Sequence, residues 1–142
     1  MSQKNVIGLA VLIALLGGVL WRTVLNPTPP PRDARSIEVL TEAANAANSE
    51  LPVQIDAETE FSRVEALPGV LVYNYRLVKQ KANELDPVKV AEALRPIVLQ
   101  SACSTPETRK RLLAAGVALR YTYLDRDKAQ VTSFDIALAD CK

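Results

Sequence analysis

The chain has 142 residues, with 17 lysines and arginines against 16 aspartates and glutamates, and it contains no histidine. A net charge of +1 lacks the clustered basic excess that nucleic-acid binding needs. Without histidine, Ser-His pairs, Cys-His pairs and histidine-ligated metals are excluded, and two cysteines are too few for a four-ligand structural zinc site. The composition therefore predicts a non-enzymatic protein with no cofactor, no metal and no nucleic-acid partner.

An uncharged apolar run, VIGLAVLIALLGGVLW, occupies residues 6–21 and extends as RTVL to Leu25. Twenty helical residues span roughly 30 Å, which is about the thickness of one hydrocarbon core. Trp21 lies where an aromatic residue commonly marks a membrane interface, and Arg22 is near enough to reach the headgroups. The sequence predicts a membrane anchor over residues 1–25, in contact with lipid through residues 6–25.

Two other interpretations of this run are a cleaved signal peptide and a buried helix. A signal peptide has an apolar core of about 7–15 residues before a small-residue cleavage site, whereas GGVLWRTVLNP is a poor cleavage site. A helix of a small domain is rarely apolar on all sides. Both comparisons favour a retained anchor.

The orientation of the anchor is ambiguous from charge. Only Lys4 precedes the run, while Arg22, Arg32 and Arg35 follow it, and this count favours a cytoplasmic C-terminal domain. The position of the run at the N-terminus and the cysteine pair favour export instead. We predict a single-pass protein of the bacterial inner membrane with its C-terminal domain in the periplasm.

A proline-rich linker, NPTPPPRDA, follows at residues 26–34, and its four prolines favour an extended polyproline II stalk. One domain is then predicted over residues 35–142. It begins with a helix near residues 34–49, because apolar residues recur there at helical spacing. Short strands are predicted in LPVQID, EFSRVEAL and VLVYNYRLV, and Pro68-Gly69 forms the turn of a hairpin between the last two.

Two helices are predicted next. Asp86 with Pro87 indicates the start of the first, whose buried stripe is Val90, Leu94, Ile97 and Val98, and Pro96 is expected to kink or split it. The second begins with a capping box from Ser104 to Glu107, or with Thr105 as its cap, and ends at Gly116.

The chain ends with strands in VALRYTYL and AQVTSFDIALADC, separated by the turn DRDK. Phe134, Ile136 and Leu138 are expected to face the core. The order of elements predicts an α+β fold, in which a small antiparallel sheet carries about three helices on one face.

The two cysteines, Cys103 and Cys141, lie at the end of a predicted helix and near the end of the chain. A disulfide between them would close a long loop and stabilise the fold by roughly 3–4 kcal/mol, and it would persist in an oxidising compartment. Two free thiols are the alternative. Because strict strand alternation points Cys141 away from the helix side, the bond requires a bulge or strand end near Ala139.

All four tyrosines lie on predicted strands, and they form either a candidate binding face or a cover for the sheet: Tyr73, Tyr75, Tyr121 and Tyr123. Arg76 and Arg120 have the opposite parity and are expected to form a solvated charged face with Asp135. Asp125 and Asp127 in DRDK lack the glycine and glutamate of a calcium loop, and we interpret them as a turn.

The segments LPVQIDAETEFSRVEALPGVLVYNYRLV and CSTPETRKRLLAAGVALRYTYLDRD, with the final DC, resemble a group of small exported, mostly uncharacterised α+β proteins of gamma-proteobacteria with a C-terminal cysteine pair. The resemblance covers about residues 50–141. It implies export, a compact α+β domain and a Cys103–Cys141 bond, and it carries no known site residues.

These features favour a membrane-anchored periplasmic protein that binds or supports another envelope protein or complex. A pilin-like subunit of a pilus or secretion apparatus is an alternative, although the pilin processing site is missing from the sequence. A carboxylate-dependent hydrolase using Glu58, Glu60 or Glu65 is the third hypothesis. The sequence leaves the oligomeric state open.

Overall fold

The computed structural model describes residues 31–142, of which Arg32–Lys142 form one compact unit. The anchor expected over residues 1–25, and most of the linker, lie outside the described residues. Within residues 31–142, none of the helices combines the length and apolar character that crossing a membrane requires.

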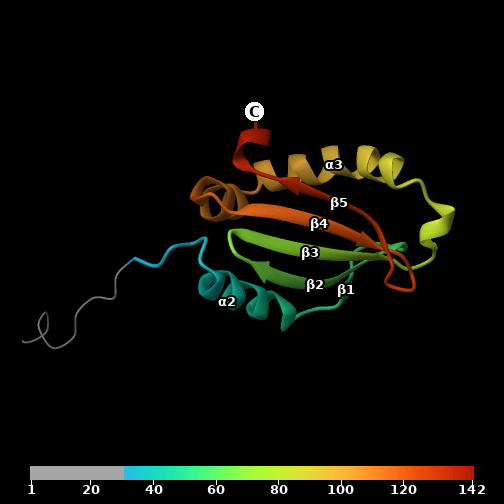
Figure 1. The fold of residues 1–142 in the computed structure, drawn as a ribbon, viewed down its shortest axis with the longest axis horizontal. Helices are drawn as coiled ribbons and strands as arrows, with labels where there is room; N and C mark the ends of the chain where they lie inside the picture. Colours follow the sequence, from blue (N-terminus) through green and yellow to red (C-terminus); the bar gives the residue numbers. More distant parts are fainter. Residues whose placement is uncertain (1–30) are drawn as a thin grey trace, which may run out of the picture. The chain divides into compact units, whose positions relative to one another are not determined.

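A five-stranded sheet forms the centre of the unit, and its strands follow one another in space as they do along the chain (Figure 1). β2 and β3 form the predicted hairpin, in which Leu67 pairs with Val70 across the Pro68-Gly69 turn. The strands are β1 (Val53–Gln54), β2 (Thr59–Leu67), β3 (Val70–Leu77), β4 (Ala118–Leu124) and β5 (Gln130–Ile136).

The sheet is mixed, so the predicted purely antiparallel sheet is wrong. β3 and β4 pair in parallel, with Val70 opposite Ala118 and Arg76 opposite Leu124, and the other pairs are antiparallel. The connection between β3 and β4 contains helix α3 (Pro87–Ser104), which returns the chain to the end where β3 begins. Parallel neighbours need such a crossover connection.

Helix α2 (Ile37–Asn48) begins at Ser36, whose hydroxyl accepts a hydrogen bond from the Val39 amide, and it packs on β2 (Figure 1). Leu40 and Ala44 are its buried residues. At its end, the Asn48 side-chain amide bonds both the N–H and the C=O of Val64, each at 2.8 Å. These two hydrogen bonds satisfy the backbone groups of Val64, which lies beyond the short pairing of β1 with β2.

Helix α3 begins as predicted, with the Asp86 carboxylate accepting hydrogen bonds from the Val88 and Lys89 amides. It packs along β5 and is continuous across Pro96, so the predicted split does not occur. Ile97, which was predicted to be buried, is 65 % exposed. The side chains that α3 contributes to the core are Val90, Leu94, Val98, Leu99 and Ala102.

The segment after α3 is a π-helix, η2 (Thr108–Leu112), followed by a 3₁₀ turn, η3 (Leu113–Ala115). The predicted capping box does not form, because the Ser104 hydroxyl donates to the Gln100 carbonyl within α3. Gly116 ends the segment with a φ of 86°, in the left-handed region that glycine favours.

One core lies between the sheet and the helices. Its most completely buried side chains come from α2, from η3, from the residue just before β4 and from the adjacent strands β4 and β5: Leu40, Leu113, Val117, Leu119 and Ile136. We call the opposite face of the sheet the open face, and it carries polar and charged residues. The two faces therefore offer different chemistry to a partner.

Candidate functional site

Six aromatic rings lie side by side on the helix face of the sheet, and we call them the aromatic strip. Strand register explains the arrangement, because Phe61 pairs with Tyr75, and Tyr75 pairs with Tyr123. The ring centroids of these two pairs are 4.8 and 5.3 Å apart. The strip consists of Phe61, Tyr73, Tyr75, Tyr121, Tyr123 and Phe134.

Only part of the strip is accessible. Tyr121 and Tyr123 are 7 % and 4 % exposed, whereas Tyr73 and Tyr75 on β3 are half-buried. Of the four tyrosines that the sequence offers as a candidate binding face, the β3 pair is therefore the part that a partner could reach. The binding role of these tyrosines stays a prediction.

The tyrosine hydroxyls remain protonated at neutral pH. Burial raises the pKa of Tyr123 to about 12, and burial also raises the pKa values of Tyr73, Tyr75 and Tyr121. A phenol with a raised pKa donates hydrogen bonds but is a poor base or nucleophile near pH 7. The strip is chemically suited to binding and poorly suited to acid–base catalysis.

The accessible tyrosines lie on the central strand between the two helices, since α2 packs on β2 and α3 on β5. Arg95 of α3 reaches outward to the β5 carbonyl of Asp135 and to Asp140. Two residues rotate a helix by about 200°, so Ile97 lies on the side of α3 opposite to Arg95. The exposed Ile97 and the half-buried Tyr73 and Tyr75 are apolar side chains that a partner could reach.

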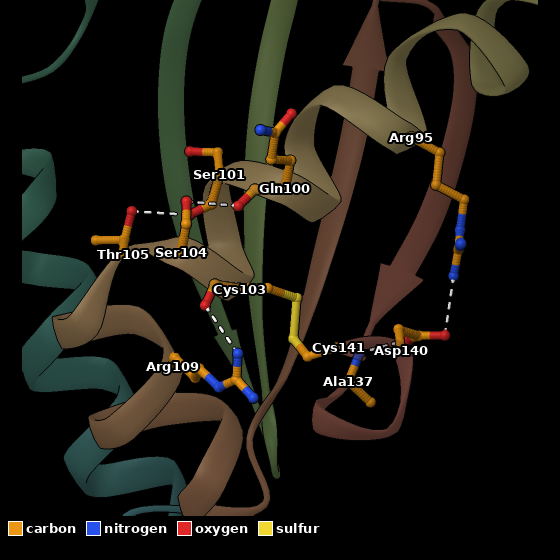
Figure 2. The surroundings of a disulfide bond; sticks show 10 residues. All are labelled: Arg95, Gln100, Ser101, Cys103, Ser104, Thr105, Arg109, Ala137, Asp140 and Cys141. Carbon is orange, nitrogen blue, oxygen red and sulfur yellow. Dashed lines mark hydrogen bonds and ion pairs between the residues drawn. A yellow bond between two sulfur atoms is a disulfide. The ribbon is translucent and has the colours of Figure 1, made fainter.

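The structure joins Cys103 and Cys141 in a disulfide, with the two Cα atoms 5.6 Å apart (Figure 2). The strand ends at Ile136, and the 3₁₀ turn η4 (Leu138–Asp140) turns the chain so that Cys141 meets α3. Strict strand alternation required a bulge or strand end near Ala139 for this bond to form, and the end of β5 followed by η4 meets that requirement. As a result Leu138, predicted to face the core, is 40 % exposed.

Polar contacts surround the disulfide. The Arg109 guanidinium donates to the Cys103 carbonyl at 3.3 Å, and Arg95 forms an ion pair with Asp140, also at 3.3 Å. Asp140 in turn accepts a hydrogen bond from the Ala137 amide (Figure 2). The disulfide and the Arg95–Asp140 pair fix the end of the chain to α3, which is a structural role.

The open face holds the carboxylates of the hydrolase hypothesis. Arg76 donates two hydrogen bonds to Glu60 and holds the pKa of that carboxyl below its usual range. A carboxyl with a lowered pKa is ionised at neutral pH and cannot act as a general acid. Glu58 and Glu65 are exposed. The geometry therefore gives the hydrolase hypothesis no support.

Arg120 and Asp135 form the predicted cross-strand pair on the open face, with two hydrogen bonds of 2.8 and 3.1 Å. Arg76, which was expected to join them, pairs with Glu60 instead. In the described part of the chain, no three side chains of the types that bind metals lie close enough to hold an ion.

Sequence reasoning did not place Phe61 and Phe134 with the tyrosines. Phe134 has the expected parity, so its place in the strip could have been inferred from the β4–β5 register. Phe61 is harder, because a bulge between Phe61 and Arg63 breaks the alternation of β2. The bulge explains why this segment has a weak strand pattern.

Comparison of the sequence with protein-family models and with curated proteins found no match. Among solved structures, the chain is similar to PA3611, a candidate secreted protein of Pseudomonas aeruginosa, with a TM-score of 0.66 and 17 % identity over 81 % of this chain and 100 % of that one.

It is also similar to two pilotins of type II secretion systems. EpsS of Vibrio vulnificus gives a TM-score of 0.61 and 12 % identity, over 78 % of this chain and 94 % of EpsS. AspS of Vibrio cholerae gives 0.56 and 14 %, over 74 % of this chain and 91 % of AspS. At these identities the likeness establishes the fold, so the chain shares its α+β architecture with a candidate secreted protein and with secretion-system pilotins.

Proposed function

We propose that the protein is a non-enzymatic component of the bacterial envelope that supports a secretion complex, as a pilotin does, by binding another protein. The observation that carries this proposal is the fold shared with two type II secretion pilotins along most of the length of all three chains. The composition agrees with it, since the chain has no histidine and thus lacks the usual general base.

The proposed location is the periplasmic side of the inner membrane, with the protein anchored through residues 6–25. The apolar N-terminal run supports the anchor. The disulfide supports export, because such bonds persist in oxidising compartments and are rare in the cytosol. The candidate secreted protein of the same fold agrees with export.

The proposed contact surface is the accessible part of the aromatic strip, Tyr73 and Tyr75, together with Ile97 of α3. Aromatic side chains carry much of the energy at protein interfaces, because they bury a large area at a small cost in side-chain entropy. The partner segment would present apolar side chains to the rings.

Site-specific photo-crosslinking in the native host tests the proposal. A benzophenone amino acid in place of Tyr75 should crosslink to a component of a secretion complex, while the same group in place of Ser133 on the open face should not. Crosslinking of neither position, or of both equally, would contradict a specific contact at the strip.

Two exposed residues of α3 provide a matched pair for the same assay. Ile97 and Val88 are 65 % and 63 % exposed, and nine residues place them on opposite sides of the helix. Ile97→Asp should reduce the Tyr75 crosslink at least tenfold, and Val88→Asp should leave it unchanged. Equal effects of the two variants would count against the proposed surface.

A further inference from the structure

We propose that the end of the domain at which the linker enters is a surface that binds anionic phospholipid headgroups. It is formed by Arg35, Leu67, Arg109, Lys110 and Arg111, and we call it the linker-end surface. The inference rests on the proposed function, because it requires the anchor to hold the domain beside a membrane.

Arg35 is the residue around which this surface assembles. Its carbonyl accepts a hydrogen bond of 3.0 Å from the Gly69 amide in the β2–β3 turn. Its side chain lies against both glycines, and a Cβ on Gly116 would lie 3.2 Å from the Arg35 Cδ. The entering chain, the β2–β3 turn and the end of η3 therefore meet at one end of the domain.

Figure 1 shows the same grouping. The η2 and η3 turns, the β2–β3 turn and the start of α2 lie at one end of the unit, and the β4–β5 turn lies at the other. The basic run Arg109-Lys110-Arg111 is in η2, so it belongs to the end at which the chain enters. The position of these charges follows from the fold.

The charges on the linker-end surface are available to a ligand. Arg109, Lys110 and Arg111 are all exposed, and Arg111 pairs only with the exposed Glu107 of the same segment. The partner of Arg109 is a neutral carbonyl, that of Cys103. Leu67, 43 % exposed at the β2–β3 turn, adds an apolar side chain at the same end of the domain. Cations together with an exposed apolar residue match the chemistry of an anionic headgroup region.

The linker-end surface is the part of the domain that the chain reaches first after the predicted anchor. The apolar run ends at Leu25, and residues 26–31 lead to Arg32. Six residues span at most about 20 Å. The strands, of up to nine residues, place the β4–β5 turn roughly 25–30 Å from the linker end. Charge attraction fades within about 10 Å of a surface at physiological salt, so binding of headgroups would hold the linker-end surface within this distance of the membrane.

Each lysine or arginine near an anionic surface contributes about 1 kcal/mol, which is about a fivefold change in affinity. The run 109–111 would therefore change the population of the membrane-bound orientation by up to about a hundredfold at low salt. This orientation would therefore depend on the charge of the lipid and on ionic strength. A tether without a lipid-binding surface would show no such dependence.

The experiment uses the full chain in nanodiscs of phosphatidylcholine alone or with phosphatidylglycerol, each containing a lipid with a nitroxide headgroup. Paramagnetic broadening of backbone amide signals reports which part of the domain lies near the headgroups. We expect amides 109–111 to broaden at least fivefold more in the anionic discs, and to return to the phosphatidylcholine level in 1 M salt. Equal broadening in the two lipids would overturn the inference.

Matched triple variants separate charge from position. Arg109→Gln with Lys110→Gln and Arg111→Gln should abolish the lipid-dependent broadening. Lys79→Gln with Arg126→Gln and Lys128→Gln, which removes equal charge at the other end, should preserve it. The amide spectrum of β3 and β4 checks that both variants are folded, and equal effects of the two variants would overturn the inference.

The same preparation distinguishes the two proposals. If the chain does not enter the nanodiscs, the anchoring part of the proposed function fails, and this inference fails with it. If the chain enters and shows no lipid-dependent broadening, the linker-end surface alone is wrong.

Discussion

The Asp125 side chain organises the β4–β5 turn from a buried position, with 4 % of the residue exposed. Its carboxylate accepts hydrogen bonds from the Asp127 and Ala129 amides within the turn and from the Ala82 amide 43 residues earlier in the chain. These hydrogen bonds hold the pKa of Asp125 below its usual range, and the bond from the Ala82 amide has the largest effect. One side chain thus ties the turn to the segment before α3.

Asp125→Asn tests this role through pH. A carboxyl with a lowered folded-state pKa stabilises the fold above its unfolded pKa of about 4, and the stabilisation is lost as pH falls through the folded pKa. The variant should unfold at lower urea concentration at pH 7, and the difference from wild type should shrink as pH falls below about 4. Urea denaturation at pH 7 and pH 3 measures both effects.

Asp127→Asn is the matched control, because the Asp127 carboxylate is exposed and its nearest cation, Arg126, is 3.8 Å away. It should leave the urea midpoint nearly unchanged at both pH values. A control that matches the Asp125 variant would mean that loss of any charge in the turn, and not the buried bonds, causes the effect.

Residue-level prediction from the sequence succeeds where local rules decide the outcome. Asp86 and Pro87 indicate the start of α3, and the interpretation of Asp125 as a turn residue is confirmed. The bond from Ala82 to Asp125 and the pairing of Asn48 with Val64 could not be predicted, because each joins residues that only the folded sheet brings together.

At the scale of elements, the types were predicted correctly and one strand pairing was predicted wrongly. Alternation identified the strands, but the antiparallel expectation for the sheet failed at β3 and β4, which are joined through α3. A helical connection between two strands is the usual sign of a parallel pair, so the signal was present in the order of elements. The prediction that Ile97 is buried was wrong, because the face of α3 that packs on the core is narrower than the apolar residues of this helix indicate.

The disulfide is the link between elements that we expect to matter most for stability. Cys103 and Cys141 are 38 residues apart, and a loop of this length corresponds to about 4 kcal/mol of unfolding free energy in the chain-entropy model. Cys103→Ser with Cys141→Ser should lower the free energy of unfolding by about this amount, as measured by urea denaturation.

Reductant gives the internal check on that measurement. Wild type in dithiothreitol should unfold at the urea midpoint of the double serine variant, and the variant should be insensitive to reductant. A loss below about 1 kcal/mol would show that η4 and the Arg95–Asp140 pair hold the end of the chain without the bond.

At the scale of the whole molecule, the contacts of residues 32–35 define where the folded unit begins. The sequence predicted a domain from residue 35, but Arg32 makes a bidentate pair with Glu42 of α2. Asp33 accepts a hydrogen bond from the Arg35 amide, and Arg35 bonds Gly69. The described unit therefore starts at Arg32, and the end of the proline-rich segment is part of it.

Two truncations test where folding begins. Residues 32–142 contain the sheet, the core and the disulfide, so this fragment should match the full chain in its unfolding midpoint when both are measured in the same detergent. Residues 37–142 lose the Ser36 cap and the Arg35 bond to Gly69, and should be less stable by about 1–2 kcal/mol. Ser36→Ala in the longer fragment isolates the cap and should cost about 1 kcal/mol. If the longer fragment unfolds well below the full chain, residues 1–31 contribute to the stability of the domain, and the domain does not fold independently of them.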